Sequence, residues 1–91
     1  MPFLERRIFR INERLGHLAE EERLVAAELE VHRHLDDDAR RDAAVSEHPI
    51  DREDARETAA DVARFERLVA GIVRKRQRLE ASRDRLLARL G

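Results

Sequence analysis

The stretch Ser46-Glu47-His48-Pro49-Ile50-Asp51 decides the fold, because the chain is expected to reverse its direction there. Pro49 has no backbone N–H and disfavours a helical conformation at His48, the residue before it. Asp51 can then accept a hydrogen bond from a free N–H group at the start of a new helix. Helical patterning runs on both sides of this stretch, which is therefore the predicted tip of a helical hairpin.

On both sides of the turn, residues of one face recur at alternating steps of three and four, as in helices that pack along a coiled-coil seam. The first seam comprises Leu4, Ile8, Ile11, Leu15, Leu18, Glu22, Val25, Leu29, His32, Asp36 and Ala39. The second comprises Ala55, Thr58, Val62, Phe65, Val69, Ile72, Arg76, Leu79, Arg83, Leu86 and Leu90. We therefore expect an all-α fold, an antiparallel two-helix coiled-coil hairpin that forms a single domain over residues 1–91. Its helices would cover about residues 3–44 and 51–90, with the turn over about residues 46–50.

The sequence leaves the end of the first helix open. The seam turns polar from Asp36 onward, so the helix either frays there or continues to about Val45. Ala39, Ala43 and Ala44 favour continuation, because alanine has the best helix propensity.

The two seams also predict which residues face each other. In an antiparallel hairpin, facing residues have numbers with a constant sum. A sum of 94 pairs Leu4 with Leu90, Ile8 with Leu86, Leu15 with Leu79, Val25 with Val69, Leu29 with Phe65 and His32 with Val62. The centre of this register is residue 47, inside the expected turn. The same register places Glu22 one helical turn diagonally from Arg76, so these two side chains are expected to pair.

The composition suits a thin helical seam and no thick globular core. Apolar residues make up 42% of the 91 residues, but the only aromatic residues are three Phe. Charged residues make up 43%, as in long solvated helices.

There is no Cys, which excludes disulfides and thiolate metal sites. We find no signal peptide and no apolar run of about 18 residues, so we expect a cytoplasmic protein without a membrane partner.

A second apolar set lies beside the seam. Its members are Phe9, Leu24, Val31, Leu35, Leu68, Val73 and Leu87. Two helices alone bury little surface, and extra apolar residues of this kind are what a four-helix assembly uses. We therefore expect a homodimer of hairpins or a hairpin docked on a partner protein; the packing direction of the hairpins is left open.

Charge is unevenly distributed along the chain. Residues 1–20 and 71–91 together carry a formal charge of +6, and residues 21–70 carry −7. We expect a basic open end, with Arg74, Lys75 and Arg78 as its binding residues, and an acidic closed end. Charge separation of this kind can orient and accelerate binding to charged partners.

The residues that could carry chemistry form no recognisable site. His34 and Asp38 are spaced i, i+4 on one helical face, but no further ligand completes a metal site. Ser46 and Ser82 lie in no nucleophile motif, and there is no glycine-rich phosphate loop. The interior basic residues of a helical chorismate mutase are not recognisable either. We therefore expect no enzyme, no catalytic residue, no metal and no cofactor.

Two further functions remain open beside a protein-binding module. The basic end could bind nucleic acid as a nucleoid-associated protein, through phosphate contacts that do not read the bases. Alternatively, the chain is a purely structural homodimer.

The segment Asp51-Arg52-Glu53-Asp54-Ala55 resembles the acidic tip of the coiled-coil hairpin in the DksA/TraR and Gre factors. In the DksA group the tip pattern is D-x-x-D-x-A near the start of the second helix, and Ala55 comes one position earlier here. The resemblance covers about residues 20–75. It implies a bacterial transcription regulator that enters the secondary channel of RNA polymerase.

In this family the tip acids act near the catalytic magnesium, a role that the resemblance assigns to Asp51 and Asp54 alone. We expect Asp36, Asp37 and Asp38 to support them at an acidic tip. The chain lacks the zinc-binding cysteines of DksA/TraR and the globular domain of Gre factors.

Overall fold

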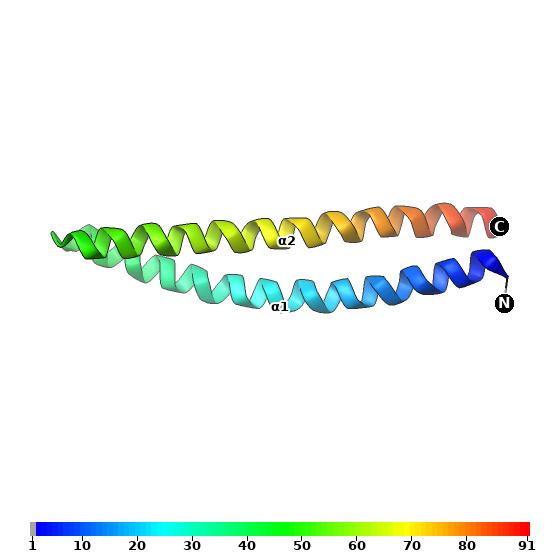
Figure 1. Ribbon diagram of the computed structural model, residues 1–91, viewed down its shortest axis with the longest axis horizontal. Helices are drawn as coiled ribbons and strands as arrows, with labels where there is room; N and C mark the ends of the chain where they lie inside the picture. The colour runs from blue at the N-terminus through cyan, green and yellow to red at the C-terminus, as the bar shows by residue number, and fades with distance from the viewer. Residues whose placement is uncertain (1) are drawn as a thin grey trace. The chain divides into compact units, whose positions relative to one another are not determined.

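The computed structural model describes residues 2–91 and consists of two α-helices joined by a short turn (Figure 1). Helix α1 spans Phe3–Val45 and helix α2 spans Pro49–Leu90. The expected all-α helical hairpin is confirmed, since the described residues contain no strand. Contacts divide the chain into two compact units. The terminal unit comprises Met1–Arg23 and Ala70–Gly91, and the turn unit comprises Leu24–Val69.

Helix α1 continues through its polar last turns to Val45, which answers the question that the sequence left open. The N–H of Ser46 donates to the carbonyl of Asp42 at 3.0 Å and extends the helical pattern by one bond. The Ser46 hydroxyl then accepts from the N–H of His48 at 3.1 Å, as in a serine turn. The chain is thereby reversed over residues 46–48.

Helix α2 begins at Pro49, two residues earlier than we expected. Proline suits the first helical position, because its fixed φ is helical and its missing N–H would have no partner there. The carbonyl of His48 accepts from the N–H of Asp51 at 3.2 Å, so His48 stands at the cap position. The expectation that Asp51 caps the helix is therefore wrong, and Asp51 lies in the first turn of α2.

In the turn unit, the two helices pack in the predicted antiparallel register. The Thr58 hydroxyl donates to the carboxylate of Asp36 at 3.0 Å, and these residue numbers add to 94. The His32 ring stacks on Phe65 with the ring centroids 4.6 Å apart, although the register had paired His32 with Val62, so this contact is a diagonal one. Leu29 lies buried at the same interface.

In the terminal unit, the buried apolar residues are Leu18, Ile72 and Leu86, all three from the predicted seams. Arg76 Nε lies 3.2 Å from Glu22 Oε1, which confirms the expected diagonal pair. Nη1 of Arg76 donates to Glu80 Oε1 at 2.9 Å. The hydrogen bond to Glu80, and after it the one to Glu22, raises the pKa of Arg76.

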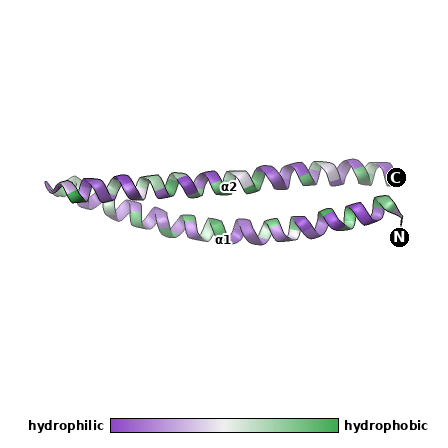
Figure 2. Ribbon diagram, viewed as in Figure 1, coloured by the Kyte–Doolittle hydropathy of each residue, from purple (hydrophilic) through white to green (hydrophobic). Residues whose placement is uncertain are grey.

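The core is as thin as the composition predicts. Only four apolar residues of the described chain are buried, and green apolar positions alternate with purple polar ones along both ribbons (Figure 2). Leu90, a predicted seam residue, is nevertheless exposed, because it lies in the last turn of α2. Other large apolar side chains outside the seam are exposed too, namely Phe3, Phe9, Leu24, Val31, Leu35, Val45, Ile50, Leu68 and Leu87. No helix in residues 2–91 is apolar over a stretch long enough to cross a membrane.

Candidate functional site

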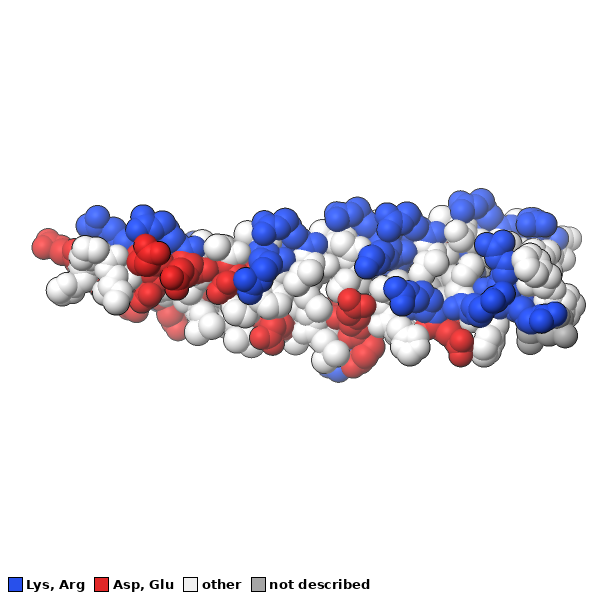
Figure 3. Space-filling model, in the orientation of Figure 1, with Lys and Arg blue, Asp and Glu red and all other residues white. Residues whose placement is uncertain are grey.

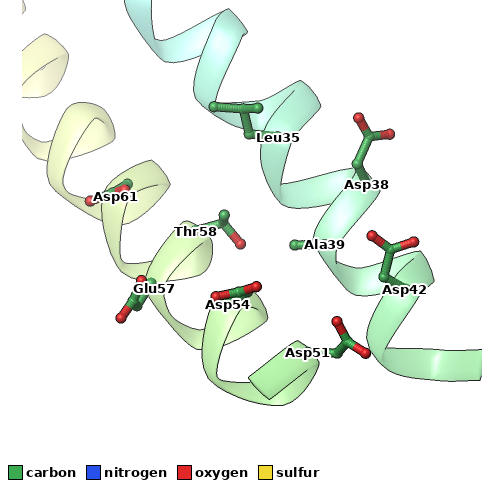
Figure 4. A pocket seen from close by; sticks show the side chains of 9 residues that line it. All are labelled: Leu35, Asp38, Ala39, Asp42, Asp51, Asp54, Glu57, Thr58 and Asp61. Carbon is green, nitrogen blue, oxygen red and sulfur yellow. The ribbon is translucent and has the colours of Figure 1, made fainter. Parts of the chain in front are cut away.

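A groove of about 320 Å³ lies beside the turn, between α1 and α2 of the turn unit (Figure 4). We call it the acidic groove; its lining residues are Leu35, Asp38, Ala39, Asp42, Asp51, Asp54, Glu57, Thr58 and Asp61. Asp51 and Asp54 lie on the side of α2 that faces α1 (Figure 4). Six of the nine lining residues are acidic, so the groove is a concentrated source of negative potential.

Two of these six carboxylates have basic partners. Asp38 pairs with Arg41, and Asp61 lies 3.2 Å from Arg64 and 4.0 Å from His32. The other four have no ion pair or side-chain hydrogen bond among residues 2–91; they are Asp42, Asp51, Asp54 and Glu57. Carboxylates that share one groove without basic partners favour the approach of a cationic group.

The structure brings three of the five predicted acidic residues into this groove, Asp38, Asp51 and Asp54. Asp36 is instead only 8% exposed, because it occupies a seam position. Its carboxylate accepts from Thr58 and lies 3.2 Å from Arg40 Nε.

Asp37 is exposed and pairs with Arg40 at 2.5 Å, outside the acidic groove. Each step along an α-helix turns the side chain by about 100°, so three consecutive aspartates cannot share a face. Asp42, Glu57 and Asp61 line the groove and were not among the predicted site residues. Their helical spacing from Asp38 and Asp54 was the available signal.

The terminal unit carries two adjacent grooves lined by basic residues. One, of about 340 Å³, is lined by Arg14, Leu18, Lys75, Arg78, Leu79 and Ser82. The other, of about 250 Å³, is lined by Arg7, Ser82, Arg85, Leu86 and Arg89. We call these the basic grooves. Figure 3 shows Lys and Arg spread over the terminal unit on the face it presents.

Of the predicted basic residues, Lys75 and Arg78 line a basic groove and Arg74 does not. Arg74 is exposed elsewhere on α2. Within residues 2–91, neither Lys75 nor Arg78 takes part in an ion pair, and the same holds for Arg14. These cations are therefore available to an anionic surface.

His32 and His34 each lie near a carboxylate but belong to no set of metal ligands among the described residues. His34 lies 4.0 Å from Glu30, and His32 lies 3.7 Å from Glu28. The described residues contain no group of three His, Cys, Asp or Glu side chains arranged to hold a metal ion.

Comparisons with known proteins identify no relative. A scan against protein-family models, a search of curated proteins and a search of solved structures each found no match to this chain.

Proposed function

We propose that the protein is a non-catalytic helical module that binds a partner protein through the acidic groove. The observation that carries this proposal is a group of four carboxylates that have no ion pair within residues 2–91, namely Asp42, Asp51, Asp54 and Glu57. A cationic segment of a partner would neutralise them, and association would be faster at low ionic strength.

Bacterial RNA polymerase is the partner that we propose, which would make the protein a cytoplasmic transcription regulator. Two features support this choice. Asp51 and Asp54 match the tip acids of the secondary-channel factors in sequence, and both line the acidic groove beside the turn. Their position in the first turns of α2 leaves them next to the point where the chain reverses.

Binding of purified RNA polymerase from the source cell tests this proposal. We expect the Asp51→Asn/Asp54→Asn variant to lose most co-purification with the polymerase and to lose its effect on transcription. The matched control is Asp37→Asn/Glu53→Gln, which removes the same charge from the same unit. Asp37 and Glu53 lie outside the acidic groove and pair with Arg40 and Arg56.

Failure of the unaltered protein to bind the polymerase would refute the partner. Equal loss in the groove variant and in the control would refute the groove. Circular dichroism of both variants checks that the helices are retained.

A second function is favoured by the basic grooves, whose cations Arg14, Lys75 and Arg78 have no ion pair within the described chain. They would contact the phosphates of a nucleic acid, with a binding constant that falls steeply as salt is raised. We expect Arg78→Glu to weaken DNA binding and to reduce its salt dependence. Arg74→Glu is the matched control, since Arg74 lies on the same helix outside the groove. An equal effect of both changes would show that only net charge matters.

A further inference from the structure

The turn unit carries apolar side chains on the same face as its acidic groove. Leu24, Val31 and Asp38 follow one another at steps of seven residues on α1. Residues seven apart lie nearly above one another on a helix, so the two apolar residues extend the row that enters the groove. Leu35 belongs to the groove itself.

Helix α2 repeats this arrangement within the turn unit. Asp54, Asp61 and Leu68 are again seven residues apart, and the two aspartates line the acidic groove. We define the acidic–apolar face as the acidic groove together with Leu24, Val31 and Leu68. These three side chains and Leu35 are 49–55% exposed, although each is large and apolar.

The terminal unit carries the complementary charge. Six cations and no acid line its basic grooves; the cations are Arg7, Arg14, Lys75, Arg78, Arg85 and Arg89. In total this unit has 12 basic and 7 acidic residues, whereas the turn unit has 7 basic and 13 acidic residues. Arginine and lysine side chains also have apolar stems that can cover leucine and valine while the charged group reaches a carboxylate.

We propose that two copies of this chain associate antiparallel, with the acidic–apolar face of one copy packed on the basic grooves of the other. Two-fold symmetry makes this contact twice, which is the usual way in which homodimers close. Six carboxylates then meet six cations in each contact. A dimer with the two turn units together would instead place the uncompensated carboxylates of both copies against each other.

This inference goes beyond the proposed function, because self-association needs neither a polymerase nor a nucleic acid. The dimer covers the acidic groove, so a polymerase that binds there has to displace the second copy. A second copy is favoured as the occupant for two reasons. Its basic grooves supply positive charge for the carboxylates, and the apolar stems of its arginine and lysine side chains can cover the exposed leucine and valine. The antiparallel direction follows from charge alone.

Sedimentation equilibrium of the full chain is the first test. At low salt we expect a mass of twice 10.6 kDa, and we expect added salt to favour the single chain. A mass of one chain at concentrations up to about 100 μM and low salt would overturn the proposal, since screening is then weakest. Such a result would assign the face to a different partner.

A reciprocal change of charge tests the direction of packing. The first variant is Asp42→Arg/Asp54→Arg/Glu57→Arg, and the second is Arg14→Glu/Arg78→Glu/Arg89→Glu. None of these six residues has an ion pair in the described chain, so the hairpin itself keeps its salt bridges. We expect each variant alone to dimerise at least about tenfold more weakly, because like charges then meet. Mixing the two variants restores complementary contacts and should restore the dimer.

The control for unspecific attraction is Arg52→Glu/Arg67→Glu/Arg74→Glu, which has the same net charge as the second variant. These three residues are exposed and line none of the grooves. The control should dimerise alone and should rescue the first variant less than the second variant does, because only one of the two contacts in that mixed dimer is complementary. Rescue by the control to the same degree, or no rescue by the second variant, would refute antiparallel packing.

Discussion

Asp36 is a carboxylate at a position where the helical seam would normally hold an apolar residue. It is 8% exposed and is satisfied by the Thr58 hydroxyl and by Arg40. A buried polar group of this kind fixes the register of a helix pair at some cost in stability. Its burial is also the reason why it cannot act at the surface with Asp38, two residues further along α1.

The bond between Asp36 and Thr58 can be tested by urea unfolding followed by circular dichroism. We expect Thr58→Val to lower the free energy of unfolding by about 1–2 kcal/mol, because Asp36 loses a donor inside the seam. The double variant Asp36→Leu/Thr58→Val should be as stable as the unaltered protein or more stable, because an apolar contact replaces the polar pair. Asp37→Ala, an exposed neighbour, should change stability by less than about 0.5 kcal/mol. An unaltered stability of Thr58→Val would show that the bond contributes nothing.

At the scale of the helices, much of the fold could be predicted from the spacing of residues. All predicted seam positions except Leu90 are at least partly covered, and the pairs Asp36–Thr58 and Glu22–Arg76 follow the predicted register. The spacing does not decide where a helix starts. Helix α2 starts at Pro49. We had expected it to start two residues later, because aspartate is a preferred capping residue.

The candidate site was less predictable, because its members were chosen by their nearness in sequence. Asp36, Asp37 and Asp38 are consecutive, yet only Asp38 lines the acidic groove. Assigning each acid to a helical face by the same seven-residue repeat would have replaced Asp36 and Asp37 by Asp42 and Asp61.

Helix α1 contains a glycine that its surroundings do not require. A Cβ atom at Gly16 would meet nothing within 4 Å, and its φ angle is not positive. We therefore expect Gly16→Ala to raise the free energy of unfolding by about 0.5–1 kcal/mol, since alanine loses less backbone entropy in a helix. Thermal unfolding monitored at 222 nm checks this. A lower melting temperature would show that the glycine has a role in assembly or bending that the isolated hairpin does not reveal.

At the scale of the whole molecule, the division into two units predicts that they open with different free energies. Leu18 is 1% exposed in the terminal unit, and Leu29 is 6% exposed in the turn unit. Leu→Ala at either position should cost about 2–5 kcal/mol. We expect Leu18→Ala to accelerate hydrogen exchange chiefly in peptides of the terminal unit, and Leu29→Ala chiefly in those of the turn unit. Equal acceleration throughout by either variant would mean that the chain opens as one cooperative whole.

Helix α1 begins and helix α2 ends in the terminal unit, so both ends of the chain leave from one pair of antiparallel segments (Figure 1). A force that pulls on both ends therefore peels these segments apart, and the seam contacts break one after another. Peeling needs far less force than sliding two helices past each other, because only one pair of contacts bears the load at any moment. The two helices should therefore separate at low force when they are pulled from the terminal unit, and the hairpin would be a poor mechanical link.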